Sequence, residues 1–418
     1  MHSDSWRTAA SPWSSGDRED AAERDDLLSS TDVSIDRSLS SSIRAARVPP
    51  FHAMAMGQRA SNREAAGHRV LHLEVGQPST PAPSGALAAG ISAMESQALG
   101  YTTALGLYSL RRRIARHYAE WYEVDIPLER VLVVAGASAG FALAFMACFD
   151  VGDRVGVLEP GYPCYRNSLL ALGVEPVPIA VGPESRWAPT AQSLADAGDL
   201  DGLIIASPSN PTGAILDDAA LATLAGHCRD RSIQLISDEI YHGINYGERA
   251  STALAHSSGA VVINSFSKYF SMTGWRLGWV VIPDALTDAF ERLQQNFYIC
   301  APHVSQVVGL AAFDCQAELD AHVERYRRNR ALLLDGLAAT GITAVADADG
   351  AFYVYADVSH LTDDSMDLCS RWLDELGLAS TPGLDFDTAR GHSWVRFSYA
   401  GTADDIGAAC TALEGWTP

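Results

Sequence analysis

The chain has 418 residues, of which 47% are hydrophobic, and it carries a formal net charge of −21 at pH 7. This length predicts two or three lobes, and the acidic balance argues against a nucleic-acid partner, which requires basic stripes. The sequence contains no run of 18 apolar residues, and its first thirty residues lack a basic-then-apolar secretion signal. We therefore expect a cytoplasmic protein with no membrane partner.

The cysteines give no sign of a metal site. The chain has seven of them, at positions 148, 164, 228, 300, 315, 369 and 410. They include no Cys-x-x-Cys pair and their total is odd. This pattern favours buried free thiols over disulfides or a zinc site, so we expect no metal.

The N-terminal part is predicted to be an extension followed by a short ordered segment. Residues 1–47 are rich in Ser, Asp and Arg and poor in large apolar side chains, so we expect them to be disordered. Residues 48–78 contain a short predicted strand, 70–75, that leads into Gly76, and we expect this segment to pack with a small C-terminal domain. Glycine lets a backbone approach a ligand closely, although a simple turn explains Gly76 equally well.

Strands and helices alternate through the middle of the chain. Apolar runs of strand length occupy residues 131–135, 154–158, 174–180, 203–206, 233–237 and 260–264, with helical patterns at 141–149, 162–172 and 217–229. Such alternation is typical of an α/β fold with a doubly wound, mainly parallel sheet. We assign residues 79–315 to this large domain.

The pattern changes after two further helical stretches, 284–300 and 304–338. Short predicted strands at 350–355 and 394–398 flank a predicted helix, 365–376. Residues 316–418 are therefore predicted to form a connecting helix and a smaller α+β domain.

One residue stands out chemically: Lys268 is the only lysine in the chain. The other 29 residues in the Lys and Arg total of 30 are all arginines. A guanidinium does not deprotonate in proteins, whereas a desolvated ammonium does so readily. Arginine therefore cannot replace lysine where the chemistry needs a neutral amine. The sequence predicts that Lys268 is an amine nucleophile, with a chance surface lysine as the alternative.

A phosphate site is predicted beside this lysine. The apolar run 260–264 ends at the hydroxyls of Ser265 and Ser267, and Arg276 follows between two glycines. The carboxyl ends of parallel strands are where such sheets bind ligands. The small-residue turn 136–140, between a predicted strand and a predicted helix, suits an anion at a helix N-terminus; small residues in such a turn are as often there for packing.

Four motifs together resemble the fold-type I enzymes that use pyridoxal 5'-phosphate (PLP), and within them the class I/II aminotransferases. The resemblance covers roughly residues 48–418. The motifs are Ser207-Pro-Ser-Asn-Pro-Thr-Gly213, Asp238-Glu-Ile-Tyr241, Ser265-Phe-Ser-Lys268 with Gly274-Trp-Arg-Leu-Gly278, and Trp394-Val-Arg-Phe-Ser398. Each motif alone is weak, but their order along the chain is specific.

The resemblance implies a role for each matching residue around the cofactor ring. Lys268 would hold PLP as a Schiff base and then carry the proton between the substrate and the cofactor as general base and acid. Asp238 would face the pyridine nitrogen and keep the ring protonated, so that it accepts electrons. Tyr241 and Asn210 would donate hydrogen bonds to the ring oxygen.

The same resemblance implies how the rest of the cofactor is held. Tyr162 matches the aromatic residue that stacks on the ring, although Tyr165 is close enough to compete for this role. Tyr101 matches a residue that reaches the phosphate of the neighbouring subunit, which implies a homodimer. The phosphate of the chain's own site would be bound by Ala137, Ser138, Ser265, Ser267 and Arg276.

Arg396 matches the residue that grips the α-carboxylate of the substrate, assisted by Asn210 and the Gly76 backbone. Two departures from the family pattern concern the substrate. Asp387 stands where these enzymes commonly have glycine, so the loop that enters the site differs in shape. No loop supplying a second cation for a side-chain carboxylate is identifiable, which favours a neutral or aromatic amino donor.

These roles imply an aminotransferase that moves an amino group from an L-α-amino acid to a 2-oxo acid through the Lys268 Schiff base and pyridoxamine phosphate. A carbon–sulfur β-lyase of the same fold uses the same lysine but needs no acceptor, and it is the first alternative. A ligand-sensing regulator on this fold is the second. It would need an N-terminal DNA-binding module, for which residues 1–47 are too short and too acidic.

Overall fold

A computed structural model describes residues 41–417 of the chain. Helix α1 (Ile43–Ala46) belongs to one compact unit and the chain from Arg47 onward to another, and only the second is described below. The predicted disordered extension, residues 1–47, lies almost entirely outside the described residues.

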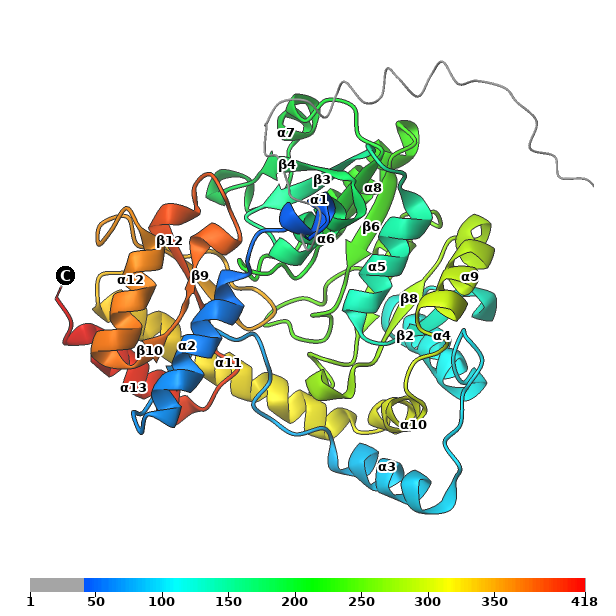
Figure 1. The fold of residues 1–418 in the computed structure, drawn as a ribbon, viewed down its shortest axis with the longest axis horizontal. Helices are drawn as coiled ribbons and strands as arrows, with labels where there is room; N and C mark the ends of the chain where they lie inside the picture. Colours follow the sequence, from blue (N-terminus) through cyan, green and yellow to red (C-terminus); the bar gives the residue numbers. More distant parts are fainter. Residues whose placement is uncertain (1–40, 418) are drawn as a thin grey trace, which may run out of the picture. The chain divides into compact units, whose positions relative to one another are not determined.

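A seven-stranded sheet forms the centre of the fold (Figure 1). Its strands, in spatial order, are β2 (Val131–Val134), β8 (Gly278–Val281), β7 (Val261–Ser265), β6 (Gln234–Asp238), β5 (Gly202–Ala206), β3 (Arg154–Glu159) and β4 (Glu175–Ala180). Strands β7, β6, β5, β3 and β4 are parallel, while β8 runs antiparallel to both β7 and β2. The predicted α/β class with a mainly parallel sheet is confirmed. The sequence prediction missed β8.

Both faces of this sheet are covered by helices, as parallel sheets require. Successive side chains of a strand point to opposite faces, and in β2 Val131 and Val133 join one hydrophobic core while Leu132 and Val134 join another. The first core includes residues of α4 (Tyr108–Tyr122) and α8 (Asp218–Asp230). The second includes residues of α5 (Ala137–Cys148), α6 (Pro163–Leu172) and α9 (Thr287–Phe297).

Two small sheets lie beyond the central one. In the first, β12 (Trp394–Ser398) pairs antiparallel with β11 (Thr381–Pro382) and β9 (Tyr353–Asp357), and in the second, β1 (Leu71–His72) pairs parallel with β10 (Leu378–Ala379). The other helices are α2 (His52–Ala65), α3 (Ser84–Ser96), α7 (Ala191–Asp196), α10 (His303–Ala312), α11 (Gln316–Ala339), α12 (Ser365–Arg371) and α13 (Ala403–Glu414).

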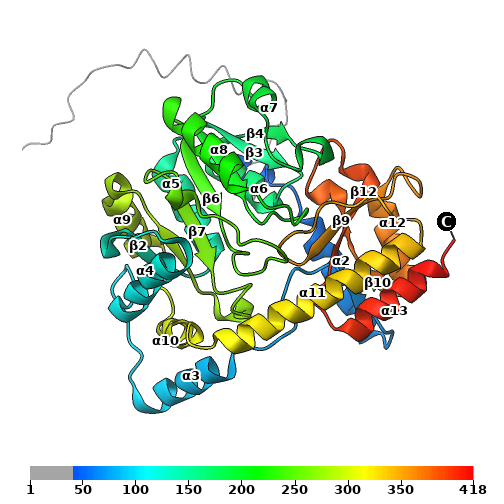
Figure 2. The ribbon, with the colours of Figure 1, turned by 180° about the vertical axis from the view of Figure 1, so that it is seen from behind.

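The long helix α11 connects the region of the seven-stranded sheet to the region of the two small sheets. It runs from the neighbourhood of α3 and α10 to that of β9 and α13, as both views show (Figures 1 and 2). At its N-terminal end Glu318 accepts hydrogen bonds from the backbone and the side chain of Ser84. Helix α2 lies against the small sheets, because Asp385 accepts the N–H groups of His52 and Ala53 at 2.8 and 2.6 Å. The domain boundaries set at residues 79 and 316 stay a prediction.

Several predicted elements differ from the observed ones. The predicted helix 141–149 begins at Ala137, because Gly136 has a φ of 86° and turns the chain directly into the helix. The small residues of the 136–140 turn therefore belong to the start of the helix, where the N–H groups of Ala137 and Ser138 have no hydrogen-bond acceptor among the described residues. The predicted strand 70–75 is only two residues long, and helices α2 and α3 were not predicted.

All seven cysteines are free, but only Cys228 and Cys369 are fully buried, so the expectation of buried thiols is wrong for the other five. Among residues 41–417, no cluster of His, Cys, Asp and Glu has the composition of a metal site. None of the described helices combines the length and the apolar character that crossing a membrane requires.

Candidate active site

A pocket of about 280 Å³ lies at the carboxyl ends of the parallel strands. Asn210 follows β5, Asp238 ends β6 and Lys268 follows β7, so the topology brings these three residues to one edge of the sheet. Every residue predicted to serve the site of its own subunit lines this pocket: Gly76, Ala137, Ser138, Tyr162, Asn210, Asp238, Tyr241, Ser265, Ser267, Lys268, Arg276 and Arg396.

Lys268 points into the pocket rather than into solvent. Its Nζ donates a hydrogen bond to the carbonyl oxygen of Gly76 at 2.6 Å. Burial lowers the pKa of Lys268 to about 8, and the nearby charges of Arg396 and Arg276 act in the same direction, while Asp238 opposes them. A much larger share of this amine is therefore neutral near pH 7 than of an ordinary lysine, as a nucleophile requires.

Asp238 is held by two donors at the bottom of the pocket. The Tyr165 hydroxyl donates to Oδ2, and the Ile240 N–H donates to Oδ1 at 3.1 Å. Burial raises the pKa of Asp238 to about 6, against the opposing effect of these hydrogen bonds and of Lys268. Most of the carboxylate is still ionised at neutral pH, so it can hold a protonated ring nitrogen.

The structure separates the two tyrosines that competed for the stacking position. Both tyrosines line the pocket, but Tyr165 lies on α6 with its hydroxyl on Asp238, whereas Tyr162 comes just before that helix. The two rings meet edge to face, with their centroids 5.3 Å apart. Tyr165 is therefore a positioning residue for Asp238, and the stacking role of Tyr162 stays a prediction.

Tyr353 is a pocket residue that the sequence prediction missed. Its hydroxyl lies 2.8 Å from that of Tyr241. A Cβ on Gly76 would lie only 1.7 Å from the Tyr353 hydroxyl oxygen, so residue 76 must be glycine while Tyr353 is present. The backbone at Gly76 therefore makes a close approach, as predicted, but the group it approaches in the structure is the Tyr353 side chain rather than a ligand. Tyr353 lies on the short strand β9, and its link to the pocket depends on contacts across the fold.

The residues of the expected phosphate site surround the N-terminus of α5. The Ser265 hydroxyl donates to Ser267 Oγ at 2.9 Å. A Cβ on Gly136 would lie 2.6 Å from Arg276 Nη2, so this arginine reaches the backbone that enters the helix. Free N–H groups, the helix dipole, two hydroxyls and a guanidinium form a donor set suited to a phosphate dianion.

Arg396 is a buried cation that lines the same pocket. Its Nη1 donates to Asn210 Oδ1 at 2.9 Å, and its Nη2 donates to the Glu74 carbonyl oxygen. Its guanidinium carbon lies 4.4 Å from the ring centre of Tyr353 and 4.8 Å from that of Phe386. No carboxylate among the described residues forms an ion pair with it, and its Nε has no hydrogen-bond partner there. The charge is therefore available to an anionic ligand.

These groups fit the cofactor that the sequence implies. One pocket holds an amine of lowered pKa, a buried carboxylate, a phosphate-type donor set and an unpaired guanidinium. PLP carries an aldehyde, a ring nitrogen and a phosphate that match the first three. The fourth matches the carboxylate of an amino acid.

Tyr101 is the one predicted site residue that does not line the pocket. Its side chain is 84% exposed. The role implied for it lies in a neighbouring subunit, so its exposure within one chain agrees with that hypothesis without testing it.

Known proteins resemble this chain over most of its length. The family model for aminotransferase class I and II matches residues 68–413. The valine–pyruvate aminotransferase of Mycobacterium tuberculosis is 47% identical over 378 residues, which cover 89% of this chain and 97% of that protein. A putative aminotransferase from Silicibacter pomeroyi is 50% identical with a TM-score of 0.85, covering 90% of this chain and 98% of that one. Aspartate aminotransferase from Thermus thermophilus has a TM-score of 0.86 at 27% identity, covering 90% and 99%.

The family match spans well over half of the chain, and it agrees with the site that the geometry describes. The chain therefore belongs to the class I and II aminotransferases, PLP-dependent enzymes that move an amino group from an amino acid to a 2-oxo acid.

Proposed function

We propose that this transaminase takes a neutral aliphatic amino acid as donor and pyruvate as acceptor, with Lys268 as the residue bonded to PLP. The observation that carries the proposal is the composition of the pocket. The only cations among its lining residues in the described chain are Lys268, Arg276 and Arg396. The amine, the phosphate and the α-carboxylate account for all three, so this chain supplies none for a side-chain carboxylate.

The rest of the pocket wall supports an apolar substrate side chain. Phe51, Met54, Val75 and Ile240 line it. Apolar walls with a few placed polar groups are typical of small-molecule sites. The relative that is 47% identical is named for valine and pyruvate, which agrees with a branched aliphatic donor.

When bound, PLP supplies an aldehyde that takes up the amino group and a ring that accepts electrons. Lys268 contributes its neutral amine, first as the nucleophile and then as the base that would take a proton from the substrate Cα and deliver it to the C4′ carbon of the cofactor. Because this amine is buried and its pKa is about 8, it can both accept and release a proton near neutral pH. Asp238 holds the proton on the ring nitrogen.

The remaining residues orient the reactants. Tyr241 and Asn210 would donate to the ring oxygen, and Arg396 would bind the α-carboxylate bidentately. Tyr162 would cover the ring and exclude water. The phosphate would bind to the backbone of the first turn of α5 and to side chains around it, those of Ser138, Ser265, Ser267 and Arg276.

The predicted division at residue 316 is part of the same proposal. Residues 79–315 would form the domain that carries Lys268, and residues 316–418 the domain that carries Arg396, with residues 48–78 packing on the latter. The bonds of Asp385 to the first turn of α2 support this packing. The substrate would then bind where the two domains meet.

A homodimer is proposed as the active unit. Large apolar side chains are exposed along one part of the sequence and near the end of α9: Ile91, Met94, Tyr101, Tyr108, Phe297 and Ile299. Where such side chains form a contiguous patch they mark an interaction site, and we propose that these six do so in the dimer. Tyr101 would reach the phosphate of the partner subunit from this surface.

A panel of amino acids tests the substrate proposal. Purified holoenzyme mixed with each amino acid, without acceptor, is expected to give the pyridoxamine spectrum with valine and other neutral aliphatic amino acids. Turnover should then require pyruvate. Efficient conversion of aspartate but not of valine would refute the proposed donor class.

The variant Lys268→Ala tests the covalent link. Borohydride reduction of the wild-type holoenzyme should fix the cofactor to the peptide that contains Lys268, as read by mass spectrometry, because the sequence has no other lysine. The variant should give no fixed side-chain adduct and lose activity. A wild-type adduct on any other side chain would contradict the assignment.

The pH dependence of Lys268 labelling tests the state of its amine. Acetic anhydride reacts with neutral amines, so the labelling rate of Lys268 in the apoprotein should rise about tenfold per pH unit and level off above a pKa of about 8. The labelling rate of the free ε-amine of Nα-acetyl-lysine in the same solution should level off above about pH 10.4. A Lys268 rate that keeps rising with that of the control would show an ordinary lysine.

The variant Arg396→Gln tests the carboxylate site. Losing one member of a buried charge pair costs about 2–5 kcal/mol. The KM of donor and acceptor should therefore rise at least about 30-fold. Arg371→Gln is the matched control, because Arg371 is a more exposed arginine paired with Glu375 at 3.1 Å. Equal KM values in the two variants would remove Arg396 from the substrate site.

A further inference from the structure

The loop between β11 and β12 contains a buried carboxylate that the proposed function does not use. Asp387 is 3% exposed, and it stands where the enzymes that this chain resembles commonly have glycine. Its Oδ1 accepts the N–H groups of Ala389 at 3.1 Å and Arg390 at 2.8 Å. Its Oδ2 accepts Arg390 Nε at 2.7 Å. Glycine offers no side-chain acceptor for these donors, so Asp387 is what fixes the direction of the Arg390 side chain.

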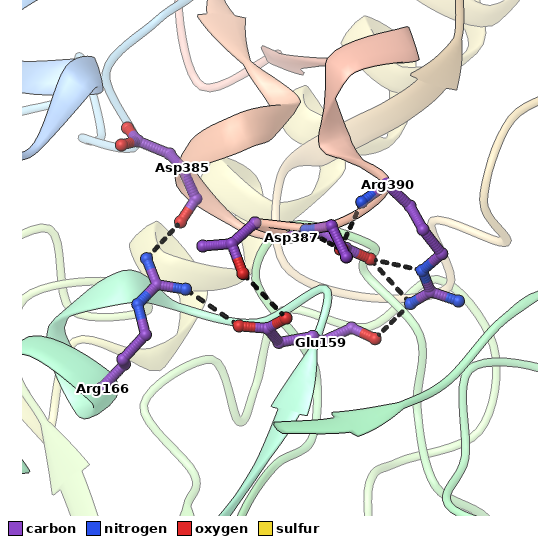
Figure 3. A network of polar contacts seen from close by, with 7 residues as sticks. Glu159, Arg166, Asp385, Asp387 and Arg390 are labelled. Atoms are coloured by element: carbon purple, nitrogen blue, oxygen red, sulfur yellow. Dashed lines mark hydrogen bonds and ion pairs between the residues drawn. The ribbon is translucent and has the colours of Figure 1, made fainter. Parts of the chain in front are cut away.

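Arg390 in turn joins this loop to the central sheet. Its Nη2 donates to the carbonyl oxygen of Glu159 at 2.6 Å (Figure 3). The same atom donates to the carbonyl oxygen of Val181 at 3.1 Å. Glu159 ends β3 and Val181 follows β4, which are neighbouring strands. The arginine side chain is 46% exposed, but its carboxylate partner is buried, so the pair is anchored from the inner side. We call Asp387 and Arg390 the clamp.

Further bonds fasten the same loop to the segment that follows β3. The Gly161 N–H donates to the Phe386 carbonyl oxygen at 2.9 Å. Arg166 donates from Nη1 to Glu159 Oε1 at 2.9 Å and from Nη2 to the Asp385 carbonyl oxygen at 3.4 Å (Figure 3). The clamp is therefore the outer part of a polar network that connects the loop to the sheet.

The loop that the clamp holds also supports the substrate side of the pocket. The Phe386 ring is buried, and its centre lies 4.8 Å from the Arg396 guanidinium carbon. The Asp385 carboxylate accepts the N–H groups of His52 and Ala53, in the first turn of α2, which lines the pocket. A shift of this loop would therefore reach both the guanidinium and the apolar wall.

We propose that Asp387 and Arg390 are positioning residues for substrate binding: by fixing Phe386 and Asp385 against the sheet, the clamp sets the orientation of Arg396 and of the first turn of α2. This inference rests on the proposed role of Arg396 as the carboxylate site. The clamp touches none of the residues proposed to hold the cofactor ring or phosphate. It therefore acts on the affinity for the substrate carboxylate and leaves proton transfer and cofactor binding unchanged.

The variant Arg390→Gln tests the clamp in the holoenzyme. The dissociation constant of isovalerate, a carboxylate that cannot react, should rise about tenfold by calorimetry, the effect of losing one hydrogen bond of a charged group. The KM of the amino donor should rise by the same factor, while kcat and cofactor content stay unchanged. Amide hydrogen exchange at Gly161 and residues 386–391 should become faster.

Two conservative variants and a control complete the test. Arg390→Lys keeps a cation and Asp387→Asn keeps an acceptor, so both should weaken isovalerate binding less than Arg390→Gln does. If Arg390→Gln fails to fold, the isovalerate dissociation constants of these two variants test the clamp instead. Arg186→Gln, a 71% exposed arginine paired with Asp347 and Asp349, is the control and should have no effect.

Several results would overturn the clamp. Unchanged isovalerate affinity in the clamp variants, with or without a lower melting temperature, shows that Asp387 and Arg390 only stabilise the fold. A lower cofactor content or a lower kcat shows an action on the cofactor pocket. If Arg396→Gln also leaves isovalerate affinity unchanged, the proposed carboxylate site fails as well; if Arg396→Gln weakens it, only the clamp fails.

Discussion

Burial of a single amine is the constraint on which this active site depends. Within residues 41–417, Lys268 Nζ has one hydrogen bond, to a backbone carbonyl, and its charged neighbours include two arginines and one carboxylate. Burial weakens the stabilisation of its charged form by water, and the arginines repel that form, so a larger share of this amine is neutral than of an exposed lysine. The chemistry of a transaminase requires that form. The sheet provides the place, because its parallel strands end where the amine, Asp238 and Asn210 converge.

The two sides of the pocket are held together by polar contacts between distant parts of the chain. Tyr241, just after β6, meets Tyr353 on β9, and Asn210, after β5, meets Arg396 on β12. Each contact joins a residue proposed to touch the cofactor ring to one from the small three-stranded sheet. Both the central sheet and the small three-stranded sheet therefore contribute residues to one pocket.

Much of the pocket was predictable because its residues lie in polar segments that directly follow short apolar strands. Asp238 and Lys268 come directly after such runs, and parallel strands bring their carboxyl ends to one edge. The sequence indicates Tyr165 only as an alternative to Tyr162 for stacking. Its position on α6 does not show that its hydroxyl reaches Asp238. Tyr353 was missed because its partners lie across the fold.

Secondary structure was least predictable where tertiary contacts decide it. Helix α2 has few large apolar residues of its own, and its first turn is stabilised by Asp385, more than 300 residues away in sequence. The antiparallel strand β8 begins at Gly278, the last residue of the motif around Arg276. Its short apolar run overlaps this motif and therefore does not stand out as a separate strand. Local pattern cannot report contacts of this kind.

The sole lysine has a practical consequence for following the folded state. A lysine-specific endoprotease has one cleavable bond in the whole sequence, and that bond lies beside a side chain buried in the pocket. The folded chain should resist such an enzyme, whereas opening of this one region exposes the bond and yields two fragments. Cleavage would therefore report the local integrity of the catalytic centre.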